Sequence, residues 1–316
     1  MTFTSLITGT GSFVPETILD NHELSRMVDT SDEWIVSRTG IRQRRIAREH
    51  TILDMALAAV RQAMKMAGVT PDGVDMILAT TSTATRCFPA LACDVQWKLG
   101  AVNAVGFDIA SSACTGFVYA MDIARRYIQT GVAKTIVIVA SEKLSDITDY
   151  ADRTTCILFG DGAGAVVVQA SQGEQGILGT YIASQGDGGA AISKSDRGYI
   201  VMNGHDVFKF AVTVMPRAID KVLEGTGLTP KDLDFVIPHQ ANIRIIESVM
   251  HKHGFDRDKM VINIDRYGNT SSATIPLALD EMNRAGRLKT GDKLVFVAFG
   301  AGLTYGATLC EWKETH

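Results

Sequence analysis

Several features that define other classes of protein are absent from this chain of 316 residues. No apolar run approaches the ~20 residues that a membrane-spanning helix requires. The N-terminus lacks the basic segment and long apolar stretch that are typical of a signal peptide. A formal net charge of −4 provides no basic surplus for binding nucleic acid. We therefore expect a cytoplasmic protein with neither a membrane span nor a nucleic-acid partner.

Cysteine is scarce, and its five occurrences are odd in number and widely scattered. They include no Cys-x-x-Cys pair, and no histidine lies at the spacing from them that a zinc site needs. This pattern disfavours both a disulfide framework and a metal site, and it fits a reducing compartment. The sequence therefore predicts no metal. The cysteines are Cys87, Cys93, Cys114, Cys156 and Cys310.

Two glycine-rich segments lack the rest of a nucleotide-binding motif. Gly9 and Gly11 are followed by Val14, where a dinucleotide-binding loop would have its third glycine. The segment 160–164 leads into a run of valines instead of a helix, and neither segment has the lysine of a phosphate-binding loop. Tight turns and close backbone packing explain both segments better. A cluster of arginines within 38–48 fits either a solvated loop or a site for a phosphate-bearing ligand.

The chain contains an internal repeat. Gly68–Leu78 aligns with Gly227–Ile237 at a constant offset of 159, and six positions keep their chemical type. Apolar residues at helical spacing precede each copy, and each copy begins with a glycine, which favours a left-handed helix end there. Pro216 is expected to mark a kink near the start of the second of these helices.

The same order of elements follows each copy of the repeat. After an aliphatic strand, we expect a second strand, a turn of small residues, a helix and a strongly apolar strand. In the first half, the second strand is 105–109, the helix is 117–129 and the apolar strand is 135–140. In the second half, the corresponding elements are 260–264, 276–284 and 293–299. Apolar strands that alternate with helices favour buried parallel sheets. We predict an α/β protein of two similar fused halves, 1–170 and 171–316, related by a pseudo-twofold axis.

Cys114 is the strongest candidate for a nucleophile. It lies on the turn between the expected strand 105–109 and the expected helix 117–129. Free amide N–H groups and the positive end of the helix dipole would stabilise a thiolate there. Gly116 permits a tight turn and the close approach of a ligand. An inert buried cysteine is the simpler interpretation for Cys93 and Cys310.

His239 and Asn269 are its candidate partners. His239 ends an apolar strand, and that edge of an open α/β sheet is where ligands bind. Asn269 lies on the turn of the second half that corresponds to the turn of Cys114 in the first. The pseudo-twofold axis therefore predicts that the two turns face each other.

This set of residues suits acyl transfer followed by decarboxylation. A cysteine can attack a thioester and hold the acyl group. Histidine and asparagine can both donate hydrogen bonds to a second thioester and so stabilise the enolate that forms as CO₂ leaves. The backbone amides of Cys114 and Ala301 are candidates for an oxyanion hole. No metal is needed, because decarboxylation itself generates the carbanion.

Over essentially its whole length the chain resembles the β-ketoacyl-[acyl-carrier-protein] synthase III family. Six motifs carry the resemblance in the same order. They are Asp29–Ile35, Arg38–Arg42, Ala113–Phe117, Phe159–Gly164, Pro238–Asn242 and Tyr267–Ser272. The resemblance implies the thiolase fold, layered α-β-α-β-α with mostly parallel sheets, and the initiating condensation of type II fatty-acid synthesis.

For the reaction, the resemblance implies that Cys114 takes an acyl primer, expected to be acetyl, from coenzyme A. His239 and Asn269 would then promote decarboxylation of malonyl-acyl-carrier protein. The carbanion would attack the acyl-enzyme in ping-pong order, and the products would be 3-oxoacyl-acyl-carrier protein, CO₂ and coenzyme A. No cofactor is implied, since the coenzyme A thioester is a substrate. The implied partners are acyl-carrier protein and a second copy of the chain.

The resemblance also implies binding residues. By motif position, Trp34 and Arg153 resemble the pair that holds the adenine of coenzyme A, with Arg38 beside them. Phe88 resembles a residue of the primer pocket and would lie near the partner subunit of a homodimer. The implied docking site for the carrier protein consists of Gln240, Ala241, Asn242, Ile243 and Arg244, with Lys209 nearby.

The chain departs from the family pattern at a few positions. Ala301 lies in a loop that is often all glycine, which would matter if the residue needed a positive φ. Tyr305 replaces a frequent tryptophan, and Ser111 with Ser112 replaces the usual alanines. None of these is one of the three catalytic candidates, and each could alter the shape of the pocket and the choice of primer.

Other functions use the same residue types. A related condensing enzyme or acyltransferase of secondary metabolism is the main alternative, and an acyltransferase would need no decarboxylation. A hydroxymethylglutaryl or plant-type polyketide synthase shares the fold but is disfavoured by the short chain. A non-catalytic subunit would be expected to lack the cysteine. A cysteine hydrolase is disfavoured by the repeat architecture.

Overall fold

The computed structural model describes residues 3–109, 113–173 and 175–314. Its first large sheet has five strands in the order β1-β7-β6-β4-β5. The strands β6, β4 and β5 pair in parallel, whereas β7 runs antiparallel to both β1 and β6. Their bounds are β1 Thr4–Phe13, β4 Met76–Thr80, β5 Val105–Asp108, β6 Thr135–Lys143 and β7 Asp161–Ser171.

The second large sheet has four strands in the order β11-β12-β13-β8. Here β11 and β12 are parallel, and β13 is antiparallel to both of its neighbours. Parallel pairing is thus confirmed for the strands that alternate with helices, but the strands next to the glycine-rich segments make each sheet mixed. The bounds are β8 Gly176–Ser184, β11 Phe235–Pro238, β12 Lys293–Gly300 and β13 Thr304–Glu311.

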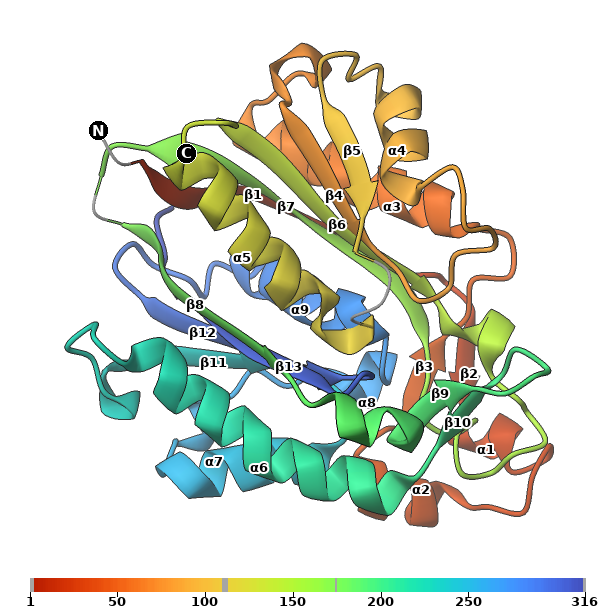
Figure 1. Ribbon diagram of the computed structural model, residues 1–316. Helices are drawn as coiled ribbons and strands as arrows, with labels where there is room; N and C mark the ends of the chain where they lie inside the picture. The colour runs from red at the N-terminus through yellow and green to blue at the C-terminus, as the bar shows by residue number, and fades with distance from the viewer. Residues whose placement is uncertain (1–2, 110–112, 174, 315–316) are drawn as a thin grey trace.

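Helices form three layers around the two sheets (Figure 1). α3 and α4 cover the outer face of the first sheet, α5 and α9 fill the space between the sheets, and α6 and α7 cover the outer face of the second. The predicted α-β-α-β-α layering is therefore present. The bounds are α3 Ile52–Ala67, α4 Leu91–Leu99, α5 Gly116–Gln129, α6 Gly204–Leu223, α7 Ile243–His253 and α9 Thr274–Arg284.

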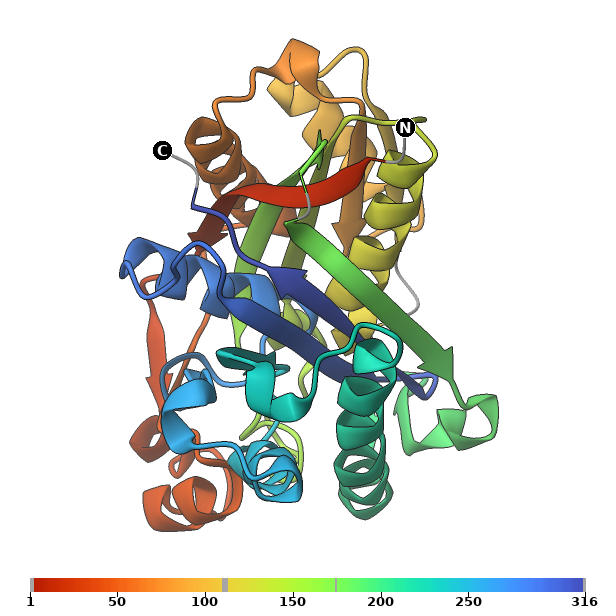
Figure 2. The same ribbon diagram turned by 90° about the vertical axis from the view of Figure 1, so that its left-hand side faces the viewer.

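Smaller elements lie beyond the carboxyl ends of the parallel strands, at the lower end of Figure 2. They pack around an apolar cluster that includes Ile35, Ile41 and Phe159. Two short hairpins, β2-β3 and β9-β10, belong to this region. The bounds are β2 Ile18–Asp20, α1 Asn21–Leu24, α2 Asp32–Thr39, β3 Gln43–Arg45, β9 Ile192–Lys194, β10 Ile200–Met202 and α8 Ile264–Tyr267.

The internal repeat of the sequence is also a repeat of structure. Each copy forms a short 3₁₀ turn, Pro71–Gly73 or Pro230–Asp232, and then a strand with a parallel neighbour, β4 or β11. The 3₁₀ turns Ala113–Thr115 and Ser271–Ala273 then precede the buried helices α5 and α9. The first residues of these turns, Ala113 and Ser271, have φ values of 42° and 50°. A residue other than glycine adopts such a backbone conformation only when its surroundings hold it there.

The expected strand 260–264 is the main error in the predicted fold. Only a single bridge joins Met260 to Val236. The side chain of Gln240 binds the segment in place of a strand, because its Nε2 donates to the carbonyl of Val261 at 3.0 Å and its Oε1 accepts from the amide of Asn263 at 3.1 Å. An amide side chain therefore satisfies backbone groups that a ladder would have used.

Two smaller expectations about helix ends also need correction. Gly68 ends α3 in a left-handed conformation with φ of 65°, as predicted. The second helix, α6, ends at Leu223, so Gly227 lies beyond it in the following turn, although its φ of 76° is left-handed as well. Pro216 lies well inside α6, which begins at Gly204, and not near its start.

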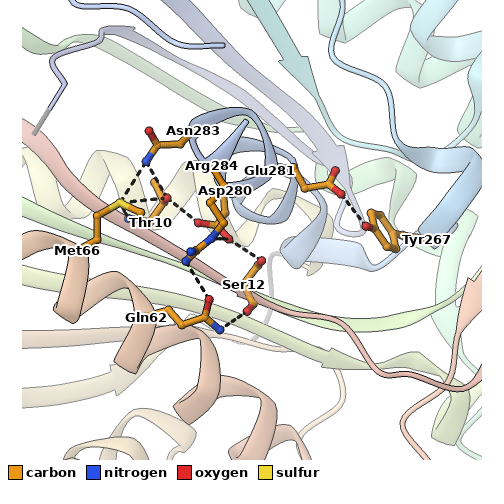
Figure 3. A network of polar contacts seen from close by, with 9 residues as sticks. All are labelled: Thr10, Ser12, Gln62, Met66, Tyr267, Asp280, Glu281, Asn283 and Arg284. Carbon is orange, nitrogen blue, oxygen red and sulfur yellow. Dashed lines mark hydrogen bonds and ion pairs between the residues drawn. The ribbon is translucent and has the colours of Figure 1, made fainter. Parts of the chain in front are cut away.

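A buried polar network joins the two halves (Figure 3). Asp280 of α9 is fully buried and accepts hydrogen bonds from two side chains of β1, Thr10 at 2.7 Å and Ser12 at 2.6 Å. Arg284, one turn later, donates to the same carboxylate at 2.8 Å. A helix of the second half is thereby bonded to the first strand of the first half.

The converse contact is present on the other side of the pseudo-twofold axis. Asp122 of α5 accepts a hydrogen bond from Thr180 of β8 at 2.6 Å. Arg126, again one turn later, donates to Asp122 at 2.8 Å. Asp122 and Asp280, which lie 158 residues apart, therefore make equivalent contacts in the two halves.

We expect Asp280→Ala to lower the free energy of unfolding by about 3 kcal/mol, since the hydroxyls of Thr10 and Ser12 lose their acceptor and Arg284 its partner. Urea unfolding followed by circular dichroism measures the change. Glu224→Ala is the control, because it removes an exposed ion pair with Lys221 at 2.8 Å and should change little. Equal effects of the two substitutions would contradict the importance of the network.

No helix among the described residues combines the length and the apolar character needed to cross a membrane.

Candidate active site

One cavity of about 890 Å³ contains the three candidate catalytic residues. Cys114, His239 and Asn269 all line it, although they are far apart in the sequence. It lies beyond the carboxyl ends of the parallel strands, where the dipoles and loops of an α/β sheet create binding sites. The structure therefore brings together the residues that the sequence analysis selected.

Cys114 is held by a crowded turn. It lies in the 3₁₀ turn that immediately precedes α5. A side chain on Gly116 would approach Cβ of Thr80 to 2.8 Å, so only glycine fits there. Thr115 contacts Thr304 through their hydroxyls at 2.7 Å, which fixes the turn against β13. The preceding Ser111 and Ser112 lie outside the described residues.

The thiol of Cys114 is stabilised in its neutral form. Burial raises the pKa of Cys114 to about 12, and the nearby Glu142 contributes in the same direction. A hydrogen bond from Sγ to Oγ of Ser271, at 3.5 Å, opposes this only in part. The stabilised thiolate expected from the helix position is therefore not the resting form, because burial favours the neutral thiol.

His239 follows β11 and is fully buried. Its backbone amide donates to the carbonyl of Val297 at 2.8 Å, and its ring packs edge-on against Phe299. Burial lowers the pKa of His239 to about 3, so the imidazole is neutral at physiological pH. Its Nδ1 lies 2.7 Å from the hydroxyl of Thr274. The same hydroxyl lies 3.0 Å from the carbonyl of Ser271, so its one proton has two possible acceptors. When it donates to Nδ1, the ring proton resides on Nε2 and can be donated to a ligand.

We expect Thr274→Val to slow decarboxylation by His239 about tenfold, because valine keeps the shape but no longer selects the tautomer. Release of CO₂ from malonyl-acyl-carrier protein measures the effect. Thr308→Val is a matched control, since the buried hydroxyl of Thr308 has no hydrogen-bond partner among the described residues. An unchanged rate in Thr274→Val would exclude this role.

Asn269 presents a donor to the cavity. Its Oδ1 accepts from the amide of Ser271 at 2.8 Å, which fixes the orientation of the side chain and leaves Nδ2 as the free end. Its backbone amide donates to the carbonyl of Leu158 at 2.9 Å, and its own carbonyl accepts from Gly160 at 3.0 Å. The glycine-rich segment of the first half therefore positions a residue of the second.

Ala301 also lines the cavity, next to Gly300. The hydroxyl of Thr304 donates to the carbonyl of Ala301 at 2.8 Å and so fixes the loop. Among the described non-glycine residues, positive φ values occur only at Ala113 and Ser271. Position 301 therefore does not require a glycine, and the alanine found there imposes no backbone strain.

Aromatic and basic side chains lie at the entrance of the cavity. Trp34 is 37% exposed, and the guanidinium groups of Arg153 and Arg38 lie 5.4 Å and 5.9 Å from its ring centroid. Trp34 and Arg38 line the cavity together with Thr154, the neighbour of Arg153. The three residues predicted to hold coenzyme A are thus brought together on one face.

The predicted docking segment divides into buried and exposed parts. Gln240 is fully buried, and its side chain is hydrogen bonded to backbone groups of Pro238, Val261 and Asn263. It therefore does not lie on the surface, where a docking residue would be expected. Ala241 is buried as well.

The rest of the segment lies nearer the surface. Asn242 caps α7, accepting from the amide of Arg244 at 2.9 Å, and Ile243 begins the helix. Arg244 is exposed, and its guanidinium lies 5.3 Å from the ring of Phe208. Lys209 is exposed on α6, adjacent to Phe208.

Two other residues lie away from the cavity within this chain. Phe88 is 84% exposed and is not among the lining residues. Tyr305 is buried on the opposite side of its sheet, with its ring 5.8 Å from that of Phe210 and 6.1 Å from that of Tyr181. The tyrosine at this position therefore does not shape the cavity directly.

A buried carboxylate that the sequence motifs did not indicate lies beside the site. Glu142 is the penultimate residue of β6 and is fully buried. Burial raises the pKa of Glu142, against the opposing effect of hydrogen bonds from Ser272 and Ser82. A polar residue at the carboxyl end of an apolar parallel strand is the kind of signal that identified His239, and it could have revealed Glu142.

Among the described residues, no cluster of three or more histidine, cysteine or acidic side chains is arranged to hold a metal ion.

Comparison with known proteins gives a consistent result. The family described as "3-Oxoacyl-[acyl-carrier-protein (ACP)] synthase III" matches residues 107–192, and its C-terminal counterpart matches residues 223–312. A curated relative from Clostridium acetobutylicum, named "Beta-ketoacyl-[acyl-carrier-protein] synthase III", is 46% identical, with 98% of each chain covered.

Solved structures agree with the sequence matches. The crystal structure of 3-oxoacyl-[acyl-carrier-protein] synthase III from Aquifex aeolicus superposes with a TM-score of 0.96 at 45% identity, covering 98% of this chain and all of that one. The priming β-ketosynthase of the R1128 polyketide pathway superposes with a TM-score of 0.94 at 36% identity, covering 100% of this chain and 98% of that one.

Proposed function

Because the chain belongs to the β-ketoacyl-[acyl-carrier-protein] synthase III family, we propose that its cavity performs the initiating condensation with Cys114, His239 and Asn269 in separate roles. The chain has the thiolase fold and is an acyltransferase of fatty-acid biosynthesis. The observation that carries the assignment of roles is the meeting of these three side chains on one cavity.

In the first half-reaction, Cys114 attacks the thioester of an acyl-coenzyme A, with acetyl as the expected acyl group. Sulfur forms a bond to the carbonyl carbon, and the carbonyl oxygen becomes an oxyanion. The backbone amides of Cys114 and Ala301 are the donors that we assign to this oxyanion. Collapse expels coenzyme A and leaves the acyl group on Sγ.

In the second half-reaction, malonyl-acyl-carrier protein occupies the same cavity. Nε2 of His239 and Nδ2 of Asn269 donate to the thioester oxygen of the extender, which stabilises the enolate as CO₂ leaves. The enolate carbon then attacks the acyl group on Cys114 and releases 3-oxoacyl-acyl-carrier protein. Two neutral donors suit this step, because neither can form an ion pair with the malonyl carboxylate and hold it in place.

Both substrates arrive through the same entrance. Trp34, Arg38 and Arg153 offer an aromatic face and positive charge to the nucleotide of coenzyme A. The exposed cations Arg244 and Lys209 suit the acidic surface of a carrier protein, with Asn242 and Ile243 at the same rim. No cofactor enters the proposed reaction, in which the coenzyme A thioester is a substrate.

We propose further that the chain works as a cytoplasmic homodimer built from the halves 1–170 and 171–316. The exposed ring of Phe88 favours burial against a second copy, where it would reach the partner's primer pocket. The five cysteines are unpaired, which fits a reducing compartment.

The test is to incubate the protein with acetyl-coenzyme A and malonyl-acyl-carrier protein and to follow CO₂ and 3-oxoacyl-acyl-carrier protein. A stable acetyl adduct on Cys114, detected by mass spectrometry, is expected before the extender is added. Absence of CO₂ release would overturn the decarboxylative mechanism in favour of a simple acyltransferase. Rapid turnover to free acetate would instead indicate a hydrolase.

The similarity to the R1128 priming ketosynthase supports one second candidate, a priming condensation in a secondary pathway. The same three residues would act, and the primer would differ. Competition between acetyl-, isobutyryl- and longer acyl-coenzyme A separates the two functions, because a preference for acetyl favours fatty-acid initiation and a preference for a longer primer favours the second candidate.

A further inference from the structure

Glu142 is a buried base that the proposed reaction has not used. Hydrogen bonds to its carboxylate come from Ser272 Oγ at 2.7 Å, from the amide of Ser82 at 2.9 Å and from the hydroxyl of Thr83 at 3.3 Å. These groups point donors at Glu142, which is the environment of an ionised carboxylate. These donors favour the ionised carboxylate next to the nucleophile, against burial, which raises the pKa of Glu142.

A continuous chain of hydroxyl groups connects this carboxylate to Cys114. The thiol donates to Oγ of Ser271 at 3.5 Å, and Oγ of Ser271 lies 3.3 Å from Oγ of Ser82. The hydroxyl of Ser82 lies 3.0 Å from both carboxylate oxygens of Glu142 and donates to them. Each hydroxyl can accept one proton and donate another, so the chain has a consistent direction from sulfur to carboxylate.

The pseudo-twofold axis relates the position of Glu142 in the first half to that of the Gly300–Gly302 loop in the second. An offset of 158 residues, which relates Asp122 of α5 to Asp280 of α9, aligns Cys114 with Ser272. It also aligns Glu142, near the end of β6, with Gly300 at the end of β12. Glu142 therefore faces the turn of the second half in the way that the Gly300–Gly302 loop faces Cys114. One strand end supplies backbone amides, and the equivalent strand end supplies a carboxylate.

The charge balance favours a proton acceptor inside the site. If the thiol proton went to solvent, a thiolate and an ionised Glu142 would share one buried region and repel each other. If the proton moves to Glu142, the single negative charge is transferred from carboxylate to sulfur, and no additional charge is buried. Nδ1 of His239 is meanwhile engaged with Thr274.

We propose that Ser271, Ser82 and Glu142 form a proton relay that accepts the thiol proton of Cys114 during acylation and returns it during condensation. The relay rests on the proposed function and adds positioning residues to it, since none of the three is assigned a contact with the reacting carbonyl.

The proton balance closes over the two half-reactions. As sulfur attacks the thioester, its proton passes to Ser271, the proton of Ser271 to Ser82, and that of Ser82 to Glu142. Coenzyme A leaves as a thiolate and takes a proton from water. When condensation breaks the bond between Sγ and the acyl carbon, the sulfur leaves with the electron pair, and the proton of Glu142 returns along the same chain.

The relay has a consequence for the extender. Glu142 is a neutral acid while Cys114 carries the acyl group, so the malonyl carboxylate enters a site without a second buried negative charge. The acyl-enzyme is thereby better suited to receive the extender than the free enzyme is.

The experiment compares single-turnover acylation of four variants by acetyl-coenzyme A, measured by mass spectrometry. Glu142→Gln removes the base, and Ser82→Ala interrupts the chain but keeps the carboxylate. Both should slow acylation roughly 100-fold, the usual contribution of a positioned proton acceptor. Ser82→Thr restores a hydroxyl and should restore most of the rate. Ser272→Ala is the control, because it removes a bond to Glu142 outside the relay.

Two readouts separate a relay from a structural role. Release of CO₂ from malonyl-acyl-carrier protein without primer should stay near the wild-type rate in Ser82→Ala, since that step needs no proton from Cys114. Thermal unfolding reports any loss of stability separately.

The outcomes are distinct. Wild-type acylation in Ser82→Ala, or equal losses in Ser82→Ala and Ser272→Ala, would overturn the relay. If Glu142→Gln does not fold, the Ser82 variants decide the question alone. A wild-type protein that neither acquires the acetyl group nor releases CO₂ would overturn the proposed function itself, which is a different result.

Discussion

Condensation should vanish in Cys114→Ala, whereas decarboxylation of malonyl-acyl-carrier protein should persist. Without sulfur no acyl-enzyme forms, and the loss of a covalent nucleophile costs on the order of 10⁶-fold in rate. His239 and Asn269 still line the cavity and can still stabilise the enolate, which is then protonated to acetyl-acyl-carrier protein. Measuring the 3-oxoacyl product and CO₂ in the same reaction separates the two activities.

Cys310→Ala provides the matched control. Cys310 is fully buried, and burial raises its pKa to about 12, as it does for Cys114, but Cys310 is not a cavity residue. This variant should keep both activities. Loss of decarboxylation together with condensation in Cys114→Ala would mean that the roles of the three residues are assigned wrongly.

The second large effect is expected at Asn269. Asn269→Ala should lower CO₂ release by roughly 10²–10³-fold, the range found when one donor to a developing oxyanion is removed. Acetylation of Cys114 by acetyl-coenzyme A should continue, because that half-reaction does not use Nδ2 of Asn269. The two rates are measured separately, by gas release and by mass spectrometry.

Asn269→Asp tests whether the slower CO₂ release comes from the loss of the Nδ2 donor or from a change in the turn. Aspartate keeps an oxygen for the amide of Ser271, so the turn retains its 2.8 Å bond, but it presents a negative charge where Nδ2 was. If the amide acts as a donor, this variant should be at least as slow as alanine. Recovery of activity in Asn269→Asp would assign only a structural role to the residue.

The positions of the main catalytic candidates were predictable from sequence because they follow from the order of elements. Cys114 precedes α5, and His239 follows β11. In an α/β sheet both kinds of position open onto the same edge. Asn269 was placed through the repeat, which relates its turn to that of Cys114. None of these inferences required knowledge of side-chain contacts.

The errors arose where side chains replace backbone interactions. The segment 260–264 has the apolar pattern of a strand, but the amide of Gln240 binds it, and a periodicity argument contains no information about such a contact. Gln240 was placed in the docking segment by its motif position in the family, which contains no information about the hydrogen bonds that bury its side chain.

The state of the nucleophile shows a different limit of local reasoning. The position of Cys114 before a helix predicts a lowered pKa, but the observed burial raises it. Helix position is visible in the sequence, whereas the surroundings of the thiol come from segments far away in the sequence, such as those of Ser271 and Glu142. Glu142 escaped notice for a similar reason, because its effect depends on hydroxyl groups from other loops.

The crossed bonds of Asp122 and Asp280 bear on how such a chain could arise. Each aspartate belongs to one half and finds its hydroxyl partner in the first strand of the other half. A single ancestral half could have satisfied both bonds only by associating with a second copy of itself about a true twofold axis. Duplication and fusion would have made that symmetry internal, after which the two equivalent turns were free to diverge, one to carry the sulfur of Cys114 and the other to carry the amide of Asn269.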